Sequence, residues 1–369
     1  MRVVCSMKGL AMASKGKVLM AMSGGVDSST AAVRLIEEGY ELIGVTMHLF
    51  CPDPDIQVKG GTCCSLDDIA DAKRVAHSLG FEHYTLNFSE QFKESVIERF
   101  CAAYEQGRTP NPCIDCNRYL KFAMLQQRRR ELECDYVATG HYARRVEFED
   151  GSFGLARGVD QAKDQSYVLY HLDQETLAHM LFPLGDMIKP QTRAMAEDNG
   201  LVNAQKDESQ DICFVSDGDY ARFIEEYRGR TFEPGDIVDV SGNVLGQHLG
   251  LIRYTIGQRK GLNLGGGQDP LYVVGKDAAN NTLVVGRGDD LLASQVEAVD
   301  INIISGKAWD GEIQAQAKVG YRMAAAPALA SVREGRLSVR FEQPVRAVSP
   351  GQSLVIYDGD IVLGGGTII

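Results

Sequence analysis

Apolar runs alternate with helically spaced apolar positions along the first half of the chain. The run KVLMAMS at 17–23 is typical of a buried strand, and Ala32, Val33 and Ile36 then share one helical face before Gly39 ends the helix. A second apolar run at 41–50 predicts another strand. Strand, helix and strand in this order form a βαβ unit, which predicts a parallel sheet.

The same alternation continues beyond this unit. The further elements expected are a helix from a capping box at 65–68 to Gly80, a strand at 81–88, helices at about 90–105 and 117–132, and a strand at 135–143. Strands that alternate with helices predict an α/β fold with an open parallel sheet for this half of the protein.

The pattern changes after about residue 216. Glycine and turn dipeptides become frequent, and short alternating runs such as EIQAQAKV, LSVRF and SLVIY are separated by turn signals. This pattern predicts a small C-terminal antiparallel β-barrel. The expected organisation is an unstructured extension at 1–16, the open-sheet domain at 17–216, a small central linking module at 217–290 and the barrel at 291–369.

Composition narrows the class of protein. The 369 residues are 44% hydrophobic and 24% charged, and no run approaches the roughly 18 uncharged apolar residues of a membrane span. We therefore expect a cytoplasmic protein that does not contact membranes. A net charge of −12 argues against non-specific coating of nucleic acid. Residues 117–130, however, contain five basic residues and no acid, which gives this segment a local charge of +5 within an acidic protein.

Nine cysteines are too few and too unevenly spaced for a disulfide scaffold. Cys63 and Cys64 are adjacent, and Cys113 and Cys116 form a CxxC motif. In a reducing compartment these spacings indicate metal binding or thiol chemistry. The adjacent pair could relay sulfur, but packing at the start of the second helix is the simpler interpretation.

The segment Ser23–Ser28, SGGVDS, joins a predicted strand to a predicted helix. Backbone N–H groups and the helix dipole converge there on an anion, and two glycines let the main chain approach it closely. The segment lacks the lysine of a Walker A loop and the spacing of a dinucleotide fingerprint. A tight turn of small residues is the simpler alternative, which the strand and helix on either side make less favourable.

Two further segments carry thiols. In TPNPCIDCN at 109–117 the prolines restrict the backbone, and Cys116 is expected at or near the N-terminus of the following helix, where the dipole stabilises a thiolate. Cys213 lies in the charged segment KDESQDICF. By itself, Cys213 would be interpreted as a small buried hydrophobic residue.

The glycine-rich segment resembles the PP-loop of the ATP pyrophosphatases. Together with TPNPCIDCN, ATGHYA, KDQSYVLY, KDESQDICFV, RYTIGQRKGL and AVSPGQS, in this order, it closely resembles the bacterial tRNA-specific 2-thiouridylase family from about Lys17 to the C-terminus. The resemblance implies that the N-terminal domain has the adenine nucleotide α-hydrolase-like fold and that the protein is a tRNA-uridine 2-sulfurtransferase. It implies that Cys116 is the catalytic nucleophile and that Cys213 carries a persulfide.

The resemblance also implies three groups of binding residues. The expected ATP-binding residues are Ala21, Met22, Ser23, Gly24, Gly25, Val26, Asp27, Ser28, Met47 and Gly140. Those expected at the target base are Asn111, Pro112 and Cys113, and those expected to contact tRNA are His141, Lys163, Asp164, Gln165, Tyr321, Arg322 and Gln352.

The implied reaction is ATP-dependent 2-thiolation of the wobble uridine, position 34, of the tRNAs for Lys, Glu and Gln. ATP with Mg²⁺ would adenylate the C2 oxygen, and a cysteine desulfurase or sulfur-relay protein would supply the sulfur. Cys113 stands where one branch of the family has an aspartate. Cys113, Cys116 and Cys213 could therefore instead hold a [4Fe–4S] cluster that binds hydrosulfide, or a zinc ion.

Two other functions remain open on the sequence. Another PP-loop synthetase could adenylate a carbonyl for attack by ammonia, but this gives Cys116 and Cys213 no task. A nucleotide- or redox-responsive RNA-binding protein would bind ATP without turnover.

Overall fold

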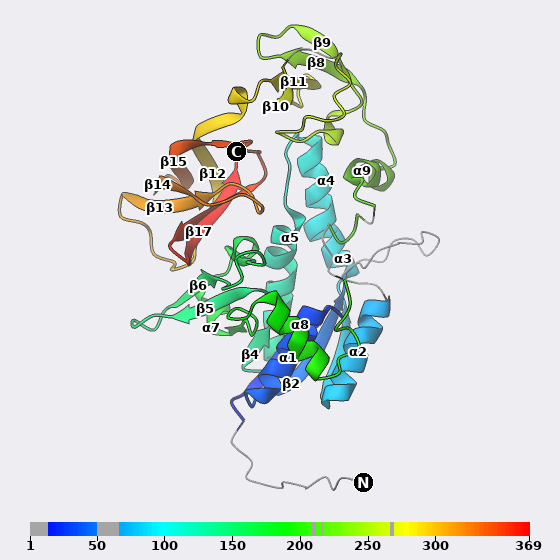
Figure 1. Ribbon diagram of the computed structural model, residues 1–369, viewed down its shortest axis with the longest axis vertical. Helices are drawn as coiled ribbons and strands as arrows, with labels where there is room; N and C mark the ends of the chain where they lie inside the picture. The colour runs from blue at the N-terminus through cyan, green and yellow to red at the C-terminus, as the bar shows by residue number, and fades with distance from the viewer. Residues whose placement is uncertain (1–13, 50–65, 208–211, 216, 266–268) are drawn as a thin grey trace.

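The computed structural model describes residues 14–49, 66–207, 212–215, 217–265 and 269–369. Most of the expected N-terminal extension, Ser65 of the expected capping box and the adjacent Cys63 and Cys64 lie outside these ranges. Figure 1 shows an α/β region at the bottom, a β-barrel above it on the left and a smaller β module at the top, towards which α4 (Glu98–Glu105) extends.

A parallel sheet forms the core of the α/β region. Its order is β3 (Glu82–Asn87), β2 (Glu41–His48), β1 (Lys17–Ala21), β4 (Tyr136–Ala138) and β7 (Met180–Leu181), and every neighbouring pair is parallel. The expected open parallel sheet is therefore confirmed.

Side-chain alternation along β1 explains why helices cover both faces of the sheet. Val18 and Met20 pack against α1 (Val26–Glu37), α2 (Leu66–Leu79) and α8 (Lys189–Asp198), while Leu19 between them packs on the opposite face. That opposite face meets α6 (Phe122–Glu131) and α7 (Gln174–Ala178). A strand buried on both sides has no polar alternation, as the apolar run in the sequence indicates.

The two helices expected at 90–105 and 117–132 are each composite. The first comprises α3 (Ser89–Phe92), a π-helical segment η1 (Lys93–Ile97) and α4 (Glu98–Glu105). The second begins five residues earlier than expected, with α5 (Pro112–Asp115), and continues through the π-helical η2 (Cys116–Lys121) into α6. It begins early because Asn111 accepts a hydrogen bond from the Cys113 amide and Pro112 occupies the first helical position.

The strand expected at 135–143 divides in two. β4 ends at Ala138, and β5 (Ala143–Glu147) pairs instead with β6 (Phe153–Arg157). This hairpin was not predicted from the sequence. β6 hydrogen-bonds to β17 of the C-terminal barrel, so the hairpin extends the barrel sheet although it belongs to the N-terminal half of the chain.

The expected antiparallel barrel is confirmed. Its strands are β12 (Leu292–Ile303), β13 (Glu312–Lys318), β14 (Ala326–Arg333), β15 (Arg336–Arg346), β16 (Ser353–Asp358) and β17 (Ile361–Ile368). Pairing of β12 with both β15 and β17 closes the sheet, which removes the unpaired edges of an open sheet.

The segment between the two regions forms α9 (Tyr220–Arg228) and a four-stranded sheet. The sheet order is β10 (Tyr272–Asp277), β11 (Thr282–Gly286), β8 (Gly235–Asp239) and β9 (Val244–His248). Short 3-10 turns lie at η3 (Ser166–Leu169), η4 (Leu251–Arg253) and η5 (Asp289–Leu291).

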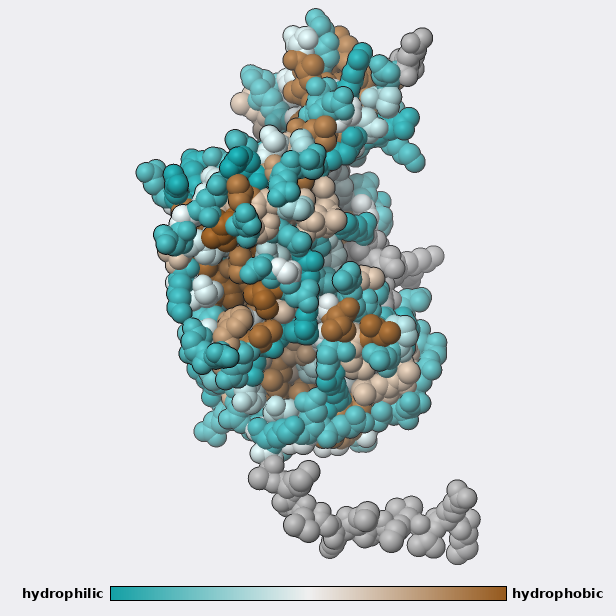
Figure 2. All heavy atoms as spheres, turned by 60° about the vertical axis from the view of Figure 1, so that its left-hand side comes forward, coloured by the Kyte–Doolittle hydropathy of each residue, from teal (hydrophilic) through white to brown (hydrophobic). Residues whose placement is uncertain are grey.

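The face of the molecule in Figure 2 is largely hydrophilic, with scattered hydrophobic areas. Within the described ranges no helix is long and apolar enough to cross a bilayer.

Candidate nucleotide and thiol site

The glycine-rich loop joins β1 to α1 at the carboxyl edge of the sheet. Gly24 has a φ of +75°, and a Cβ there would lie 2.2 Å from the carbonyl oxygen of Asp68, so only glycine fits. Gly25 is the N-cap of α1 and has no side chain that could cap the first-turn amides. A helix start of this kind is suited to an anion such as phosphate.

Asp27 in the first turn of α1 forms a partly buried ion pair that the sequence did not indicate. Lys189 Nζ lies 2.7 and 2.9 Å from the two carboxylate oxygens, and the Tyr142 hydroxyl lies 2.9 Å from Oδ1. The Lys189 side chain is only 10% exposed. Lys189 and Asp27 are 162 positions apart, so no local motif could have connected them.

A second group of side chains fixes the other side of the loop. Asn203 Nδ2 donates to the Gly24 carbonyl at 2.9 Å, and Lys206 Nζ lies 3.4 Å from the same oxygen. The ammonium also lies 2.6 Å from a carboxylate oxygen of both Asp68 and Asp71. Charged groups of both signs therefore border the loop, and none of these four residues was predicted from the sequence.

Gly140 and Met47 border this edge, where the resemblance places them. A Cβ on Gly140 would lie 2.8 Å from the Ser28 amide nitrogen, so Gly140 packs directly on the start of α1. Met47, near the end of β2, packs against the two hydrophobic clusters that contain Ile114 and Cys116. Met47 thus lies between the carboxyl edge of the sheet, where the glycine-rich loop is, and the helix that carries Cys113 and Cys116.

The two cysteines of TPNPCIDCN differ in their place on the helix and in their exposure. Cys113, not Cys116, lies in the first turn after the Asn111 cap, and Cys116 begins the π-helical η2 one turn later. Cys113 is exposed, whereas Cys116 is 6% exposed. The helix starts at Pro112, so Cys116 lies about one turn from its N-terminus, and stabilisation of a Cys116 thiolate by the helix dipole stays a prediction.

Cys213 lies against the apolar cluster that contains Cys116. This cluster also contains Phe92, Phe100 and Phe214, and Cys213 is among the half-buried residues packed on it. The structure thus places two cysteines that are far apart in the sequence at one apolar cluster. Burial raises the pKa of the Cys101 thiol in the same cluster to about 12, so that thiol stays protonated.

The sequence left a metal or cluster ligand set of three cysteines open. Among the described side chains, no group of three or more His, Cys, Asp or Glu residues is placed to hold a metal ion. Cys113 faces solvent while Cys116 is packed in the core. Cys113, Cys116 and Cys213, the alternative ligands for [4Fe–4S] or zinc, are among the described residues and form no such group in this structure.

Some residues expected to contact RNA cluster near Cys113. Tyr321 is 38% exposed, and burial together with nearby Asp164 and Cys113 raises the pKa of its hydroxyl. Lys318 Nζ lies 5.6 Å from the Tyr321 ring centroid, and burial lowers the pKa of this lysine. Arg322 follows Tyr321 and is exposed. An aromatic ring beside lysine and arginine is suited to a stacked, phosphate-bearing base.

Other expected RNA contacts have partners within the protein. Asp164 accepts hydrogen bonds from the amides of Gly158 and Ser166, and Gln165 Oε1 accepts one from the Tyr142 amide. The Lys163 amide donates to the Asp160 carbonyl within the same turn. These bonds shape the turn around 163–165, whatever it contacts outside the protein.

His141 is half-buried and adjoins the nucleotide edge. Its Nδ1 lies 2.8 Å from Thr139 Oγ1. Burial, with a smaller effect of Lys121, lowers the pKa of the imidazole to about 3, so the ring is neutral at physiological pH.

The basic segment at 117–130 is partly neutralised within the protein. Arg118 pairs with Asp300, Arg128 with Glu131 and Arg130 with Glu175.

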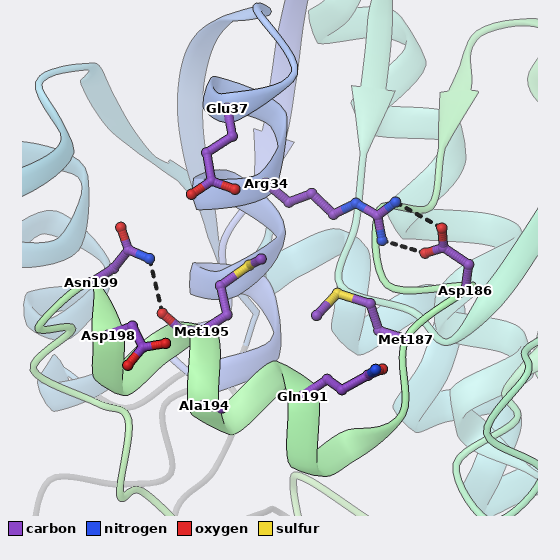
Figure 3. A pocket seen from close by; sticks show the side chains of 9 residues that line it. All are labelled: Arg34, Glu37, Asp186, Met187, Gln191, Ala194, Met195, Asp198 and Asn199. Atoms are coloured by element: carbon purple, nitrogen blue, oxygen red, sulfur yellow. Dashed lines mark hydrogen bonds and ion pairs between the residues drawn. The ribbon is translucent and has the colours of Figure 1, made fainter.

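A cavity of about 650 Å³ lies between α1 and α8, away from the glycine-rich loop. Arg34 pairs with Asp186 at this cavity (Figure 3). None of the predicted site residues lines it.

An α/β domain whose glycine-rich loop opens onto the edge of a parallel sheet, followed by a small module and a closed barrel, defines a PP-loop type of nucleotide-binding protein. Family models match three consecutive parts of the chain: the tRNA methyl transferase HUP domain at 16–217, the tRNA methyl transferase PRC-barrel domain at 221–287 and the aminomethyltransferase beta-barrel domain at 293–368. The chain belongs to the tRNA-specific 2-thiouridylase family, MnmA.

Curated relatives support this membership over nearly their whole length. The tRNA-specific 2-thiouridylase MnmA of Acetivibrio thermocellus is 48% identical over 96% of this chain and 99% of its own. That of Carboxydothermus hydrogenoformans is 49% identical over 95% and 97%, respectively. Among solved structures, an NMN synthetase from Francisella tularensis covers 60% of this chain with 19% identity and a TM-score of 0.33, a likeness too slight to bear on function.

Proposed function

We propose that the protein thiolates C2 of the wobble uridine of tRNA, with ATP as the activating substrate and Cys213 as the sulfur carrier. The observation that carries this proposal is the packing of Cys116 and Cys213 on one apolar cluster, which Met47 connects to the edge of the sheet that bears the glycine-rich loop. Family membership supports both the reaction and the RNA substrate.

Activation comes first because the C2 oxygen of uridine is a poor leaving group. The first-turn amides of α1 would bind the phosphates of ATP, and the C2 oxygen would attack the α-phosphorus. The bond to the β-phosphate breaks, and pyrophosphate leaves. The Asp27–Lys189 pair holds the start of α1 in place, and Gly140 leaves room beside it.

A Mg²⁺ ion needs only one or two protein carboxylates in addition to phosphate oxygens. Asp68 and Asp71 beside Gly24 are both paired with the Lys206 ammonium, so the ligands that we expect for the ion are the phosphate oxygens of ATP and water. Bound there, the ion would neutralise phosphate charge.

Sulfur transfer then proceeds between the two thiols. The terminal sulfur of the Cys213 persulfide attacks C2, and the bond from C2 to the adenylated oxygen breaks with loss of AMP. The Cys116 thiolate attacks Cys213 Sγ, so that the S–S bond of the persulfide breaks and its electron pair stays with the sulfur on C2. In the alternative order, Cys116 first releases hydrosulfide, which attacks C2. Both orders leave a Cys116–Cys213 disulfide, which a dithiol must reduce.

The RNA would lie across the helix start Asn111–Cys113, of which Cys113 is exposed, and across the barrel residues Tyr321 and Arg322. The target base would leave its stack so that its C2 atom becomes accessible. We expect the substrates to be the tRNAs for Lys, Glu and Gln. We also expect a cysteine desulfurase or sulfur-relay protein to load Cys213 in the cytoplasm, where other thiols stay reduced.

Complementation of a strain that lacks this activity tests the proposal. Cys116→Ser and Cys213→Ser should each abolish 2-thiouridine in the three tRNAs, measured by nucleoside mass spectrometry. Cys101→Ser is the matched control, because this thiol lies in the same cluster but stays protonated. Full 2-thiouridine with Cys213→Ser would exclude Cys213 as the sulfur carrier, and ATP binding without AMP formation would favour the non-catalytic alternative.

A further inference from the structure

The barrel contacts the loop that leads to the cysteines through the turn Ser349–Gln352. The Thr109 amide donates to the Pro350 carbonyl at 2.8 Å, and Gln352 Nε2 donates to the Thr109 carbonyl at 2.7 Å. The backbone amide and the backbone carbonyl of Thr109 are thus both hydrogen-bonded to the same barrel turn. Thr109 precedes the segment Asn111–Cys113 by only one residue.

The turn itself is rigidly attached to the barrel. The Gly351 amide donates to the Ile368 carbonyl, and the Ile368 amide donates to the Gln352 carbonyl, at 2.9 and 2.8 Å. Gly351 has a φ of +91°, and a Cβ there would lie 3.0 Å from the Thr109 nitrogen. Only glycine therefore permits this close approach between turn and loop.

A second contact lies at the other end of the thiol segment. Arg118 binds the carboxylate of Asp300 with both terminal nitrogens, one of them at 2.8 Å. Asp300 lies where the register of β12 shifts, and its φ is +55°, a conformation that aspartate tolerates better than most residues. The bidentate geometry fixes the orientation of the guanidinium.

We propose that the barrel positions the candidate nucleophile by holding the segment Thr109–Arg118 at both ends, at Gln352 and at Asp300. Cys116 lies between the two contacts, and its own π-helical turn is a less regular structure than an α-helix. In this proposal Gln352 is a positioning residue that acts on the loop in the absence of RNA. The proposal deepens the proposed function and rests on it only for the role of Cys116.

The test measures the reactivity of the Cys116 thiol in the purified full-length protein without RNA or ATP. Gln352→Met removes the hydrogen bond with little change in side-chain volume, and Gln343→Met is the matched control on an exposed position of β15. The rate of alkylation of each cysteine by iodoacetamide is followed by peptide mass spectrometry. Cys101, which is fully buried, reports general loosening of the fold.

We expect Gln352→Met to raise the alkylation rate of Cys116 about fivefold, the effect of one net hydrogen bond, with Cys101 and the control variant unchanged. Asp300→Asn, which keeps a residue that tolerates positive φ but removes the charge, should act in the same direction. Unchanged Cys116 reactivity in both variants, or a parallel rise at Cys101, would overturn the proposal.

Turnover separates the positioning role from a contact with RNA alone. If Gln352 positions the loop, Gln352→Met lowers kcat for thiolation more than it raises KM for tRNA. A raised KM with normal kcat and normal Cys116 reactivity would assign Gln352 to RNA binding only. Because alkylation needs neither substrate, it remains informative even if the proposed reaction proves wrong.

Discussion

At the scale of single residues, the ion pair between Asp27 and Lys189 shows how an acid can belong to an anion-binding loop. Its negative charge is neutralised by the nearly buried Lys189 ammonium, and the Tyr142 hydroxyl donates a hydrogen bond to the same carboxylate. An acid in the first turn also interacts favourably with the dipole of α1. The sequence motif identified Asp27, but its partner came from the other end of the domain.

Asp27→Asn should remove the ion pair while keeping the shape of the side chain. The Lys189 ammonium then loses its charged partner, so we expect the free energy of unfolding to fall by about 1–3 kcal/mol and pyrophosphate release to slow. Asp67→Asn, an exposed acid in the first turn of α2, is the control. Denaturant titration measures the free energy of unfolding, and a pyrophosphate assay measures turnover. Normal pyrophosphate release in Asp27→Asn would show that Asp27 is not an active-site residue.

A half-buried histidine, His171, makes the fold sensitive to acid. Burial, with a smaller effect of Arg118, lowers the pKa of His171 from 6.5 to about 3. Below about pH 6.5 the unfolded chain therefore binds a proton that the folded chain does not, and stability falls as the pH drops towards 3 by up to about 1.4 kcal/mol per pH unit.

His171→Phe should abolish this contribution, and the aromatic ring can keep its contact with Tyr170. Between pH 7 and pH 5, unfolding free energies measured in urea should therefore fall less in the variant than in the unmodified protein. Equal losses would show that His171 is not the group that titrates. His179→Phe provides a comparison. In the unmodified protein the His179 ring is hydrogen-bonded to the Asp135 carbonyl near the surface.

At the scale of elements, the strand ends and helix starts determine the site. Sequence periodicity located the strands and helices of the α/β half well, since each buries one defined stripe or face. It missed the division of 135–143 into two strands and placed the start of the cysteine-bearing helix five residues late. Both errors occurred where capping and tertiary contacts, rather than periodicity, decide where an element ends.

Gly140→Ala tests the contact between the end of β4 and the start of α1. The added Cβ would lie 2.8 Å from the Ser28 nitrogen and 2.9 Å from the Asp27 carbonyl carbon, and neither backbone atom can move freely. We expect overpacking to cost about 1–3 kcal/mol of stability and to weaken ATP binding in calorimetry. Gly265→Ala, which meets nothing within 4 Å, should bind ATP normally. Unaltered ATP affinity in Gly140→Ala would separate this contact from the nucleotide site.

At the scale of the whole molecule, the α/β region and the barrel share one core. The cluster around Leu19 of β1 includes Val355 and Tyr357 of the barrel. Tyr167 donates to the Ser353 carbonyl at 2.7 Å, and this tyrosine is fully buried. The sequence suggested separate domains at 17–216 and 291–369, but the hydrophobic contacts run continuously between these segments.

Removal of residues 291–369 should therefore prevent cooperative folding of the remainder. The deletion exposes Tyr167 and Tyr170 and leaves β6 without its partner β17. Calorimetry of the fragment should show no sharp transition, whereas Tyr170→Phe in the full-length protein should cost only about 1 kcal/mol. A fragment with one sharp transition near the melting temperature of the full-length protein would contradict a shared core.

The sequence by itself determined the alternation of strands and helices, the closed barrel and the glycine-rich loop, because these depend on local periodicity and on backbone conformations that few residues tolerate. Only the tertiary structure decided which charges neutralise Asp27, that Cys116 and Cys213 pack on one cluster, and that Gln352 binds the loop at Thr109. These contacts join residues about a hundred or more positions apart, and packing of the whole chain, rather than any local pattern, brings such residues together.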